Sequence, residues 1–318
     1  MAYSAGDTIL DDEYNAFVGN SSSPYGYNHF AGTGAGEYGL NQTSISTVSA
    51  GGTVQASQWN SLFTGLDNIA NHTNVSITAS SVSAGDTVAI RSALITDLAN
   101  LAAAVAGGST SATALAAASS VGSSTNAGTW NSTSTIERSV TFANNATMRA
   151  FFNAGGFIRI DPSCVTGIAG SKDTVFNDLT VTATGNLDLK AHSTTRSGAG
   201  ETLTTNGLAN GFHDLGTGYT VLLKLTSDNS GYTSDTVEYS AKLNAAVSSA
   251  TVLTIKMVSS DPAADTTYTS PNTSGVPANP NEAPRMTLAL LASNPNNTQG
   301  LAAGITSSSN AQVSNSAS

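Results

Sequence analysis

The sequence of 318 residues predicts an α+β protein in which a small N-terminal helical domain is followed by an all-β sandwich or jelly-roll domain. Three observations carry this prediction. Up to about residue 106, apolar residues recur at the intervals of three and four that amphipathic helices show. From Thr129 onward, short runs rich in β-branched residues alternate with glycine-rich turns. Between the two lies a stretch of Gly, Ser, Thr and Ala with the composition of a linker.

These patterns divide the chain into a helical docking or assembly domain, a linker, a β-sandwich domain and an extended C-terminal tail, at residues 1–106, 107–127, 128–293 and 294–318. The helical domain holds three copies of one phrase, at residues 4–9 (Ser-Ala-Gly-Asp-Thr-Ile), 49–54 (Ser-Ala-Gly-Gly-Thr-Val) and 83–88 (Ser-Ala-Gly-Asp-Thr-Val). The copies begin 45 and 34 residues apart (49 − 4 and 83 − 49), which is too irregular for a solenoid.

Each copy of the phrase precedes an apolar stripe with helical spacing. The three stripes consist of Tyr14, Phe17 and Val18, then Trp59, Leu62, Phe63, Leu66 and Ile69, and then Ile90, Leu94, Leu98, Leu101 and Val105. None of these helices can bury its stripe alone, so we expect the three to form a small bundle.

The segment between the first two helices combines glycines with Tyr25, Tyr27, Phe30 and Tyr38. One interpretation is an extended arm that docks on a neighbouring subunit, because aromatic residues concentrate in interface cores. The other is a loop folded back on its own bundle. The many glycines give the segment little reason to fold by itself, which favours the arm. We therefore expect these four residues to form part of an assembly interface.

The β domain is predicted to contain seven strands, at residues 130–142, 157–160, 179–191, 219–225, 236–244, 251–259 and 285–292. Short strands at this spacing favour a sandwich or jelly roll. A long Pro/Asn/Thr loop at 262–284 contains Tyr268, which joins the candidate interface residues, since loops of this length are usually functional. The tail has the composition of a disordered segment, and we expect a neighbouring subunit to hold it.

Charged residues make up only 10% of the chain, against about 25% in ordinary soluble domains. Ser, Thr, Asn, Ala and Gly replace them and give a neutral, hydrogen-bonding surface that suits lattices and appendages; a secreted or low-complexity polypeptide is the alternative. The net charge of −10, with 11 scattered Lys and Arg, argues against nucleic-acid and acidic-membrane partners. No signal peptide or membrane span is expected. The single cysteine excludes an intrachain disulfide.

No arrangement of residues predicts catalysis, so we expect a non-enzymatic protein without a metal or cofactor. His29, His72, His192 and His213 stand singly in the sequence, and Cys164 is interpreted as a small buried filler. A glycosidase would need two paired carboxylates. The acidic residues weighed for that role are Asp173, Asp178, Asp188, Glu201, Asp214, Asp235 and Glu238. A calcium site at Asp261, Asp265 and Glu282 lacks the spacing of a known loop, so we expect these charges to be solvated.

One stretch, residues 142–160, is compact and rich in aromatic residues. A strand ends near Phe142, and Asn144 or Asn145 can cap the short helix that follows. Residues 148–152 give this helix an apolar side, through Met148, Phe151 and Phe152. The Gly-Gly pair at 155–156 ends the helix and a second strand begins. We interpret this unit as the folding centre of the C-terminal domain.

Residues 151–160 (Phe-Phe-Asn-Ala-Gly-Gly-Phe-Ile-Arg-Ile) resemble a motif of virion structural proteins of tailed phages, especially tail-fibre-like proteins of marine cyanophages. Residues 5–9 with Tyr14-Asn15, residues 34–39 (Gly-Ala-Gly-Glu-Tyr-Gly) and residues 59–62 (Trp-Asn-Ser-Leu) resemble the same group. The likeness covers roughly residues 1–75 and 128–260. It implies a component of the particle and carries no catalytic residues to transfer.

We therefore expect a virion protein of the tail (fibre, baseplate or neck) that acts by homo-oligomeric assembly, through weak polar contacts and a few aromatic anchors. Its expected partners are copies of itself and other virion proteins. One alternative is a receptor- or glycan-binding tail module, in which Trp130 or Tyr268 stacks on the sugars of a host-surface glycan. Another is a capsid-decorating protein, and an enzyme that degrades polysaccharide is the weakest alternative.

Overall fold

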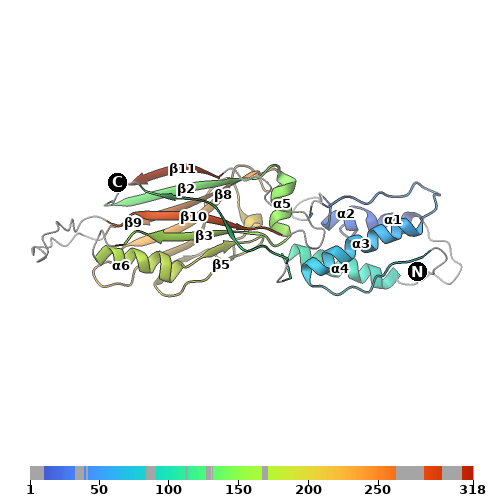
Figure 1. Cartoon of the computed structure of the whole chain (residues 1–318), viewed down its shortest axis with the longest axis horizontal. Coiled ribbons are helices and arrows are strands. Elements are labelled where there is room, and N and C mark those ends of the chain that lie inside the picture. The colour runs from blue at the N-terminus through green and yellow to red at the C-terminus, as the bar shows by residue number, and fades with distance from the viewer. Residues whose placement is uncertain are drawn as a thin grey trace, which may run out of the picture. The chain divides into compact units, whose positions relative to one another are not determined.

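The computed structural model describes residues 11–32, 39–40, 42–83, 91–111, 114–126, 130, 132–166, 171–262, 283–295 and 310–317. The chain forms two compact units, whose elements are labelled in Figure 1. The first, the helical unit, consists of Met1–Ala117, Asn144–Gly156 and Asn294–Ile305. The second, the β unit, consists of Ala118–Ala143, Phe157–Ser293 and Thr306–Ser318. Most helices lie in the first unit and two antiparallel sheets in the second, so the predicted α+β class with a β-sandwich is confirmed.

The described part of the helical unit contains the helices α1 Asp11–Val18, α2 Tyr27–Phe30, α3 Ala56–Thr73, α4 Arg91–Ala106 and α5 Asn145–Asn153. The predicted apolar stripes of α1, α3 and α4 are buried in one shared core, except for Ile90, which lies outside the described residues. The Trp59 ring packs edge-on against Tyr14 at 5.2 Å between centroids and stacks on Phe63 at 5.7 Å. The expected small bundle is therefore present, because the helices can bury their stripes only against one another.

Helix α5 forms as the sequence predicts. The Asn144 side chain caps it by accepting a hydrogen bond from the Thr147 N–H at 2.8 Å. Gly155 ends it in the left-handed region, with φ of 82°. Met148, Phe151 and Phe152 are all buried.

The unit to which α5 belongs differs from our expectation. Instead of centring the β domain, α5 is part of the helical unit, and Ala150 and Ala154 lie in the helical core. The Asn153 side chain donates to the Gly39 carbonyl at 2.9 Å, and Nε2 of His72 donates to the Ala154 carbonyl at 2.8 Å. These partners are 114 and 82 residues away in the chain, so local sequence gave no sign of them.

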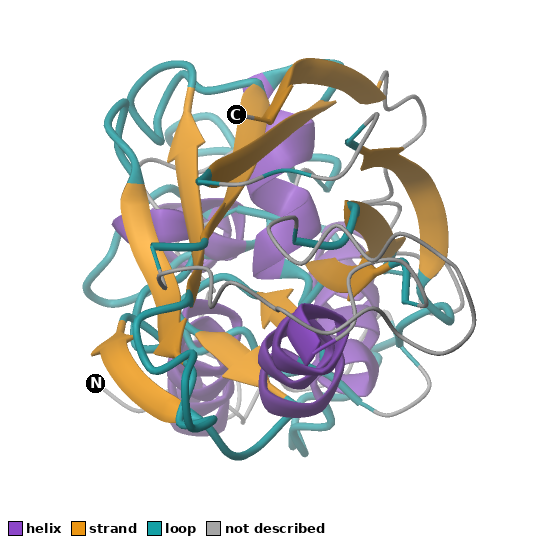
Figure 2. Ribbon diagram, turned by 90° about the vertical axis from the view of Figure 1, so that its left-hand side faces the viewer, coloured by secondary structure: helices purple, strands orange, loops and turns teal. Residues whose placement is uncertain are grey.

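The described strands are β1 Ser119–Thr125, β2 Thr133–Thr141, β3 Phe157–Cys164, β4 Leu187–Leu189, β5 Thr194–Arg196, β6 Thr202–Asn206, β7 Thr220–Thr226, β8 Thr236–Leu243, β9 Val252–Ser260, β10 Met286–Ser293 and β11 Asn310–Ala317. They form a five-stranded sheet in the order β1-β10-β3-β4-β5 and a six-stranded sheet in the order β11-β2-β9-β8-β7-β6. Figure 2 shows these strands in orange. Six predicted strands correspond to β2, β3, β7, β8, β9 and β10.

Alternation along the strands builds the apolar layer of the sandwich. On β8, Val237, Tyr239 and Ala241 are buried, and on the neighbouring β9, Ile255 and Met257 are buried. The register pairs Tyr239 with Met257 and Ala241 with Ile255, so these side chains share one face of the sheet. Their burial is the physical basis of the strand predictions in this region.

The predicted strand at 179–191 is wrong for its first half. The described chain there contains α6 Ser171–Asn177, which continues into a π-helix, η1, at Asp178–Thr184, and only β4 is extended. The Thr180 hydroxyl donates a hydrogen bond to the Phe176 carbonyl (2.6 Å), and the Thr184 hydroxyl donates one to the Leu179 carbonyl (2.7 Å). Leu179 is buried where η1 contacts β3, β7 and β8. Tertiary packing therefore overrides the β propensity of the Thr-Val-Thr sequence at residues 180–182.

Two further strands lie where we expected a linker and an extended C-terminal tail. β1 falls within 107–127 and pairs with β10, and β11 falls within the tail and pairs with β2 of the same chain. The prediction that a neighbouring subunit holds the tail is therefore replaced, for the described residues 310–317, by pairing within the chain. Both strands are at the edges of their sheets. An edge strand needs backbone pairing on one side only and little apolar pattern, so the sequence did not reveal these two.

Candidate functional site

Two asparagines of the helical unit hold extended segments of chain against the bundle. Asn15 of α1 donates from Nδ2 to the Val48 carbonyl (2.8 Å) and accepts from the Val48 N–H (2.7 Å). Asn60 of α3 makes the same two bonds with Val82, each at 2.9 Å. A carboxamide that satisfies both backbone groups of one residue replaces the partner strand that these groups would have in a sheet.

These two clamps are equivalent parts of the sequence repeat. Asn15 and Asn60 each follow an aromatic residue, and each lies ten residues after the alanine of its phrase (15 − 5 and 60 − 50). Val48 and Val82 immediately precede the next copies of the phrase, which start at residues 49 and 83. The helix that follows one copy of the phrase therefore forms hydrogen bonds with the residue that precedes the next copy. In the third copy the equivalent position is Leu94 (94 − 84), so the pattern of clamps ends there.

Two more polar side chains fix the same extended segments. Asn28 of α2 bonds the Ile45 N–H (2.9 Å) and carbonyl (2.8 Å). Asp97 of α4 is 4% exposed and accepts from the N–H groups of Thr78 (3.0 Å) and Ala79 (2.9 Å) and from the Thr78 hydroxyl (3.1 Å). Three donors offset the cost of burying this carboxylate. From residue 75 to residue 80 the partly buried and exposed side chains alternate, as in a strand, although the neighbours are helices.

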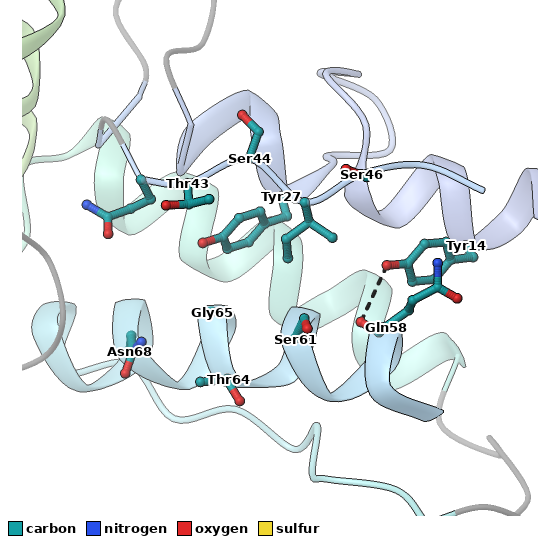
Figure 3. Close-up of a pocket in the computed structure, with 12 residues that line it drawn as sticks. Tyr14, Tyr27, Thr43, Ser44, Ser46, Gln58, Ser61, Thr64, Gly65 and Asn68 are labelled. Atoms are coloured by element: carbon teal, nitrogen blue, oxygen red, sulfur yellow. Dashed lines mark hydrogen bonds between the residues drawn. The ribbon is translucent and has the colours of Figure 1, made fainter. Parts of the chain in front are cut away.

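A cavity of about 470 Å³ lies between α3 and the extended segment 42–46, within the helical unit (Figure 3). The described lining residues carry hydroxyl, carboxamide, aromatic and aliphatic groups, and none of them is charged. They are Tyr14, Tyr27, Gln42, Thr43, Ser44, Ile45, Ser46, Gln58, Ser61, Thr64, Gly65 and Asn68. One residue in three or four along α3 contributes to the wall, which is the spacing of a single helix face.

Tyr27 is the central aromatic residue of this cavity, and Gly65 makes its position possible. A Cβ at Gly65 would lie 2.7 Å from the Tyr27 ring, so the ring packs on α3 only because this position has no side chain. Burial raises the pKa of the Tyr27 phenol to about 12, so the hydroxyl stays protonated at neutral pH and can donate. The Tyr14 hydroxyl donates to the Gln58 carbonyl at 3.4 Å (Figure 3).

The structure changes the interpretation of the candidate interface aromatics. Tyr27 and Phe30 are 5% and 0% exposed and belong to the core of their own unit, and Tyr25 packs against that core half-buried. For these residues the loop folds back on its own bundle, which is the alternative to the docking arm. Tyr38 and Tyr268 lie outside the described residues. Of the candidate interface residues that the structure describes, Tyr27 alone lines the cavity, and Tyr14, which also lines it, was predicted only as part of an apolar stripe.

Two acidic side chains of the β unit, Asp188 and Asp261, are engaged in ion pairs. Arg159 forms a bidentate pair with Asp188, with Nε–Oδ1 at 2.7 Å and the second nitrogen–oxygen contact at 2.8 Å. Asp261, which we expected to be solvated, is 4% exposed, and its carboxylate lies 2.6 Å from Nζ of Lys172. This expectation was wrong because the lysine comes from α6, 89 residues away. Asp265 and Glu282, the other candidate calcium ligands, lie outside the described residues.

Folding brings together two histidines that stand singly in the sequence. The rings of His192 and His213 stack at 4.8 Å between centroids. No third Asp, Glu, His or Cys completes a metal-binding group with them in the described part of the chain. Cys164 is half-buried, and burial raises the pKa of its thiol to about 11. The thiol therefore stays protonated and unreactive at neutral pH.

Trp130, a proposed platform for sugars, is buried rather than exposed. It is 2% exposed and donates from Nε1 to the Pro284 carbonyl at 2.6 Å. Its ring packs edge-on against Phe176 of α6, at 5.0 Å between centroids. The expectation that Trp130 stacks on a glycan is therefore wrong, because its indole ring is buried and already contacts Phe176 and the Pro284 carbonyl.

Comparison of the chain with protein-family models, with curated proteins and with solved structures found no match. Among the described residues, no helix is long and apolar enough to cross a membrane.

Proposed function

We propose that this chain is a structural component of a tailed-phage virion, placed in the tail, that acts by homo-oligomeric assembly. The observation that carries the proposal is the position of the phage-like phrases in the fold. Tyr14-Asn15, Trp59-Asn60 and the first part of the motif, residues 151–156, lie in the helical unit, while residues 157–160 of the motif begin β3 of the β unit. In the helical unit the first two supply clamps that repeat along the chain. Two of the phrases that resemble virion proteins therefore have an equivalent structural role in the helical unit, which supports the proposal.

The composition of the chain supports the same proposal. With 10% charged residues, the surface offers hydroxyl and carboxamide groups in place of ions. Contacts between such surfaces do not require the desolvation of charges, so many weak contacts can be repeated by symmetry at small cost. Partners are therefore other copies of this chain and neighbouring virion proteins.

The test is to tag the chain in the phage that encodes it, purify the particles and localise the tag by gold labelling in the electron microscope. We expect label on the tail and a few to some dozens of copies in each particle. A copy number in the hundreds on the head would favour a capsid-decorating protein instead. Purified recombinant chain should form oligomers in light scattering. A stable monomer that does not bind particles lacking it would contradict the proposal.

A further inference from the structure

The β unit holds a buried lysine in direct contact with a buried carboxylate. Nζ of Lys172, on α6, lies 2.6 Å from Oδ2 of Asp261, which follows β9, and the two side chains are 2% and 0% exposed. An ion pair at such a place is a weak source of stability, because removing two charges from water offsets most of their attraction. Stability alone therefore does not explain why this pair occupies the interior.

The register of the six-stranded sheet brings a second carboxylate to the pair. β8 and β9 run antiparallel, and their last registered pair sets Thr236 opposite Ser260. One residue further, the same register sets Asp235 opposite Asp261. The Ser227 N–H still donates to the Asp235 carbonyl at 2.9 Å, so the chain there continues the line of the strand. Asp235 is fully buried, and because opposite residues in a sheet have Cβ atoms about 4.5–5.5 Å apart, its carboxylate lies beside that of Asp261.

Aromatic packing shields the helix that carries the lysine. Phe176 lies one turn after Lys172 on α6, so the two share a face of the helix. Phe176 is fully buried and packs edge-on against Trp130, at 5.0 Å between ring centroids. Trp130 is in turn held by backbone hydrogen bonds to and from Ala283. Charged groups in such surroundings lose most of the hydration that stabilises them, which favours reactions that convert them to neutral groups.

We propose that Lys172 and Asp261 condense to an amide, a covalent bond between side chains that joins α6 to the end of β9. Nζ passes one proton to Oδ2 along the 2.6 Å hydrogen bond, which leaves an amine and a carboxylic acid. The Nζ lone pair then attacks Cγ of Asp261 and forms the C–N bond. Asp235 takes a second proton from the nitrogen and gives it to the hydroxyl group, and the Cγ–O bond breaks as water leaves. One ammonium and one carboxylate thus become one amide and one water, with no oxidant or reductant.

The fold supplies what this reaction needs. It holds the nucleophile and the electrophile in contact, which replaces a bimolecular encounter by a unimolecular step. Condensation removes two charges from the interior, and the exclusion of water slows the reverse hydrolysis. The bond spans 89 residues of the sequence, so it tethers two distant segments of the β unit. The inference does not depend on the proposed virion role, because the bond forms, or fails to form, in the isolated chain.

The test is intact-mass spectrometry of the purified full-length chain, followed by proteolysis and sequencing of the peptides. We expect a mass lower than that of the sequence by one water, and a branched peptide in which Lys172 is joined to Asp261. Lys172→Arg keeps the positive charge but is a poor nucleophile, so it should restore the full mass. Asp235→Asn should also leave the folded chain at full mass, with the circular dichroism of the parent chain, because the proton carrier is lost.

Lys224→Arg is the matched control, since the partner of Lys224, Glu238, lies 3.5 Å away in a partly exposed pair. This variant should lose water as the parent chain does, and no branched peptide should contain Lys224 in the parent. A parent chain at full mass without the branched peptide would overturn the inference, whatever the variants do. So would a loss of water that persists in Lys172→Arg, which would indicate a cyclised aspartate instead, or an Asp235→Asn chain that condenses as fully as the parent.

Discussion

The two units stabilise extended backbone segments by different means, although both are rich in Ser, Thr and Asn. In the β unit, strands such as β8 and β9 satisfy each other through backbone pairs along their whole length. In the helical unit, the segments 42–48 and 75–83 lie beside helices, and side chains of Asn15, Asn28, Asn60 and Asp97 supply the partners that a strand would. Extended backbone is thus stabilised wherever its N–H and C=O groups find partners, and a helix face can provide them.

The difference predicts that stability depends on few side chains in the helical unit and on buried packing and charge in the β unit. The largest effect is expected in the β unit. Lys172→Met would leave the buried Asp261 carboxylate without its lysine, and we expect a loss of about 3–5 kcal/mol in the free energy of unfolding. Urea denaturation measures it. The control is Lys224→Met, whose partner Glu238 lies 3.5 Å away in a partly exposed pair and should matter by less than about 1 kcal/mol. Similar losses in both would show that burial is not the cause.

In the helical unit, Gly155 is expected to be sensitive to substitution. Its φ of 82° disfavours any side chain, and a Cβ there would lie 2.0 Å from Cγ2 of Thr110. Gly155→Ala should therefore cost about 2–4 kcal/mol in thermal or urea unfolding. Gly51→Ala is the matched control, since its φ is 74° but no atom lies within 4 Å of the added Cβ. It should cost only about 1–2 kcal/mol. If the control were as harmful as Gly155→Ala, the contact with Thr110 would not matter.

The clamps can be tested one at a time. Asn60→Ala removes both hydrogen bonds to Val82 and should lower the free energy of unfolding by about 1–3 kcal/mol. Amide hydrogen exchange at Val82 should speed up, while strand amides of the β unit keep their protection. Asn71→Ala, on the same helix but exposed, should change stability by less than about 0.5 kcal/mol. Unchanged exchange at Val82 would refute the role of the clamp.

The smallest expected effect is a pH dependence confined to the helical unit. His72 is fully buried, and burial lowers the pKa of its imidazole, against a smaller raising effect of the hydrogen bond to Ala154. The unfolded chain therefore binds a proton near pH 6.5 that the folded unit does not. Stability should be full above that pH and fall as the pH drops below it, by at most about 1.4 kcal/mol per pH unit.

Urea titrations between pH 7 and pH 5 measure this slope. His72→Gln, which keeps a donor for the Ala154 carbonyl, should flatten it even if the variant is less stable overall. Equal slopes in the parent chain and the variant would assign the acid sensitivity to other groups.

The candidate site shows which of its residues could be predicted from the sequence. Tyr27 was identified because it lies among several aromatic residues in a glycine-rich segment, but the interface role expected for it conflicts with its burial. The aromatic-Asn pair at a fixed distance from the first two copies of the phrase is the sequence signal of the clamps. The cavity had no signal of its own, because its two walls come from segments that only folding brings together.

The sequence by itself determined the apolar stripes of α1, α3 and α4, the cap and end of α5 and six of the strands, including β8 and β9. Each depends on the period of apolar residues or on the conformational freedom of a glycine, which are properties of a short segment. Only the tertiary structure decided that residues 179–184 wind into η1, that α5 joins the helical unit, and that β1 and β11 are strands. These outcomes depend on which distant backbone and side chains supply hydrogen-bond partners and cover the surface, and no local pattern contains that information.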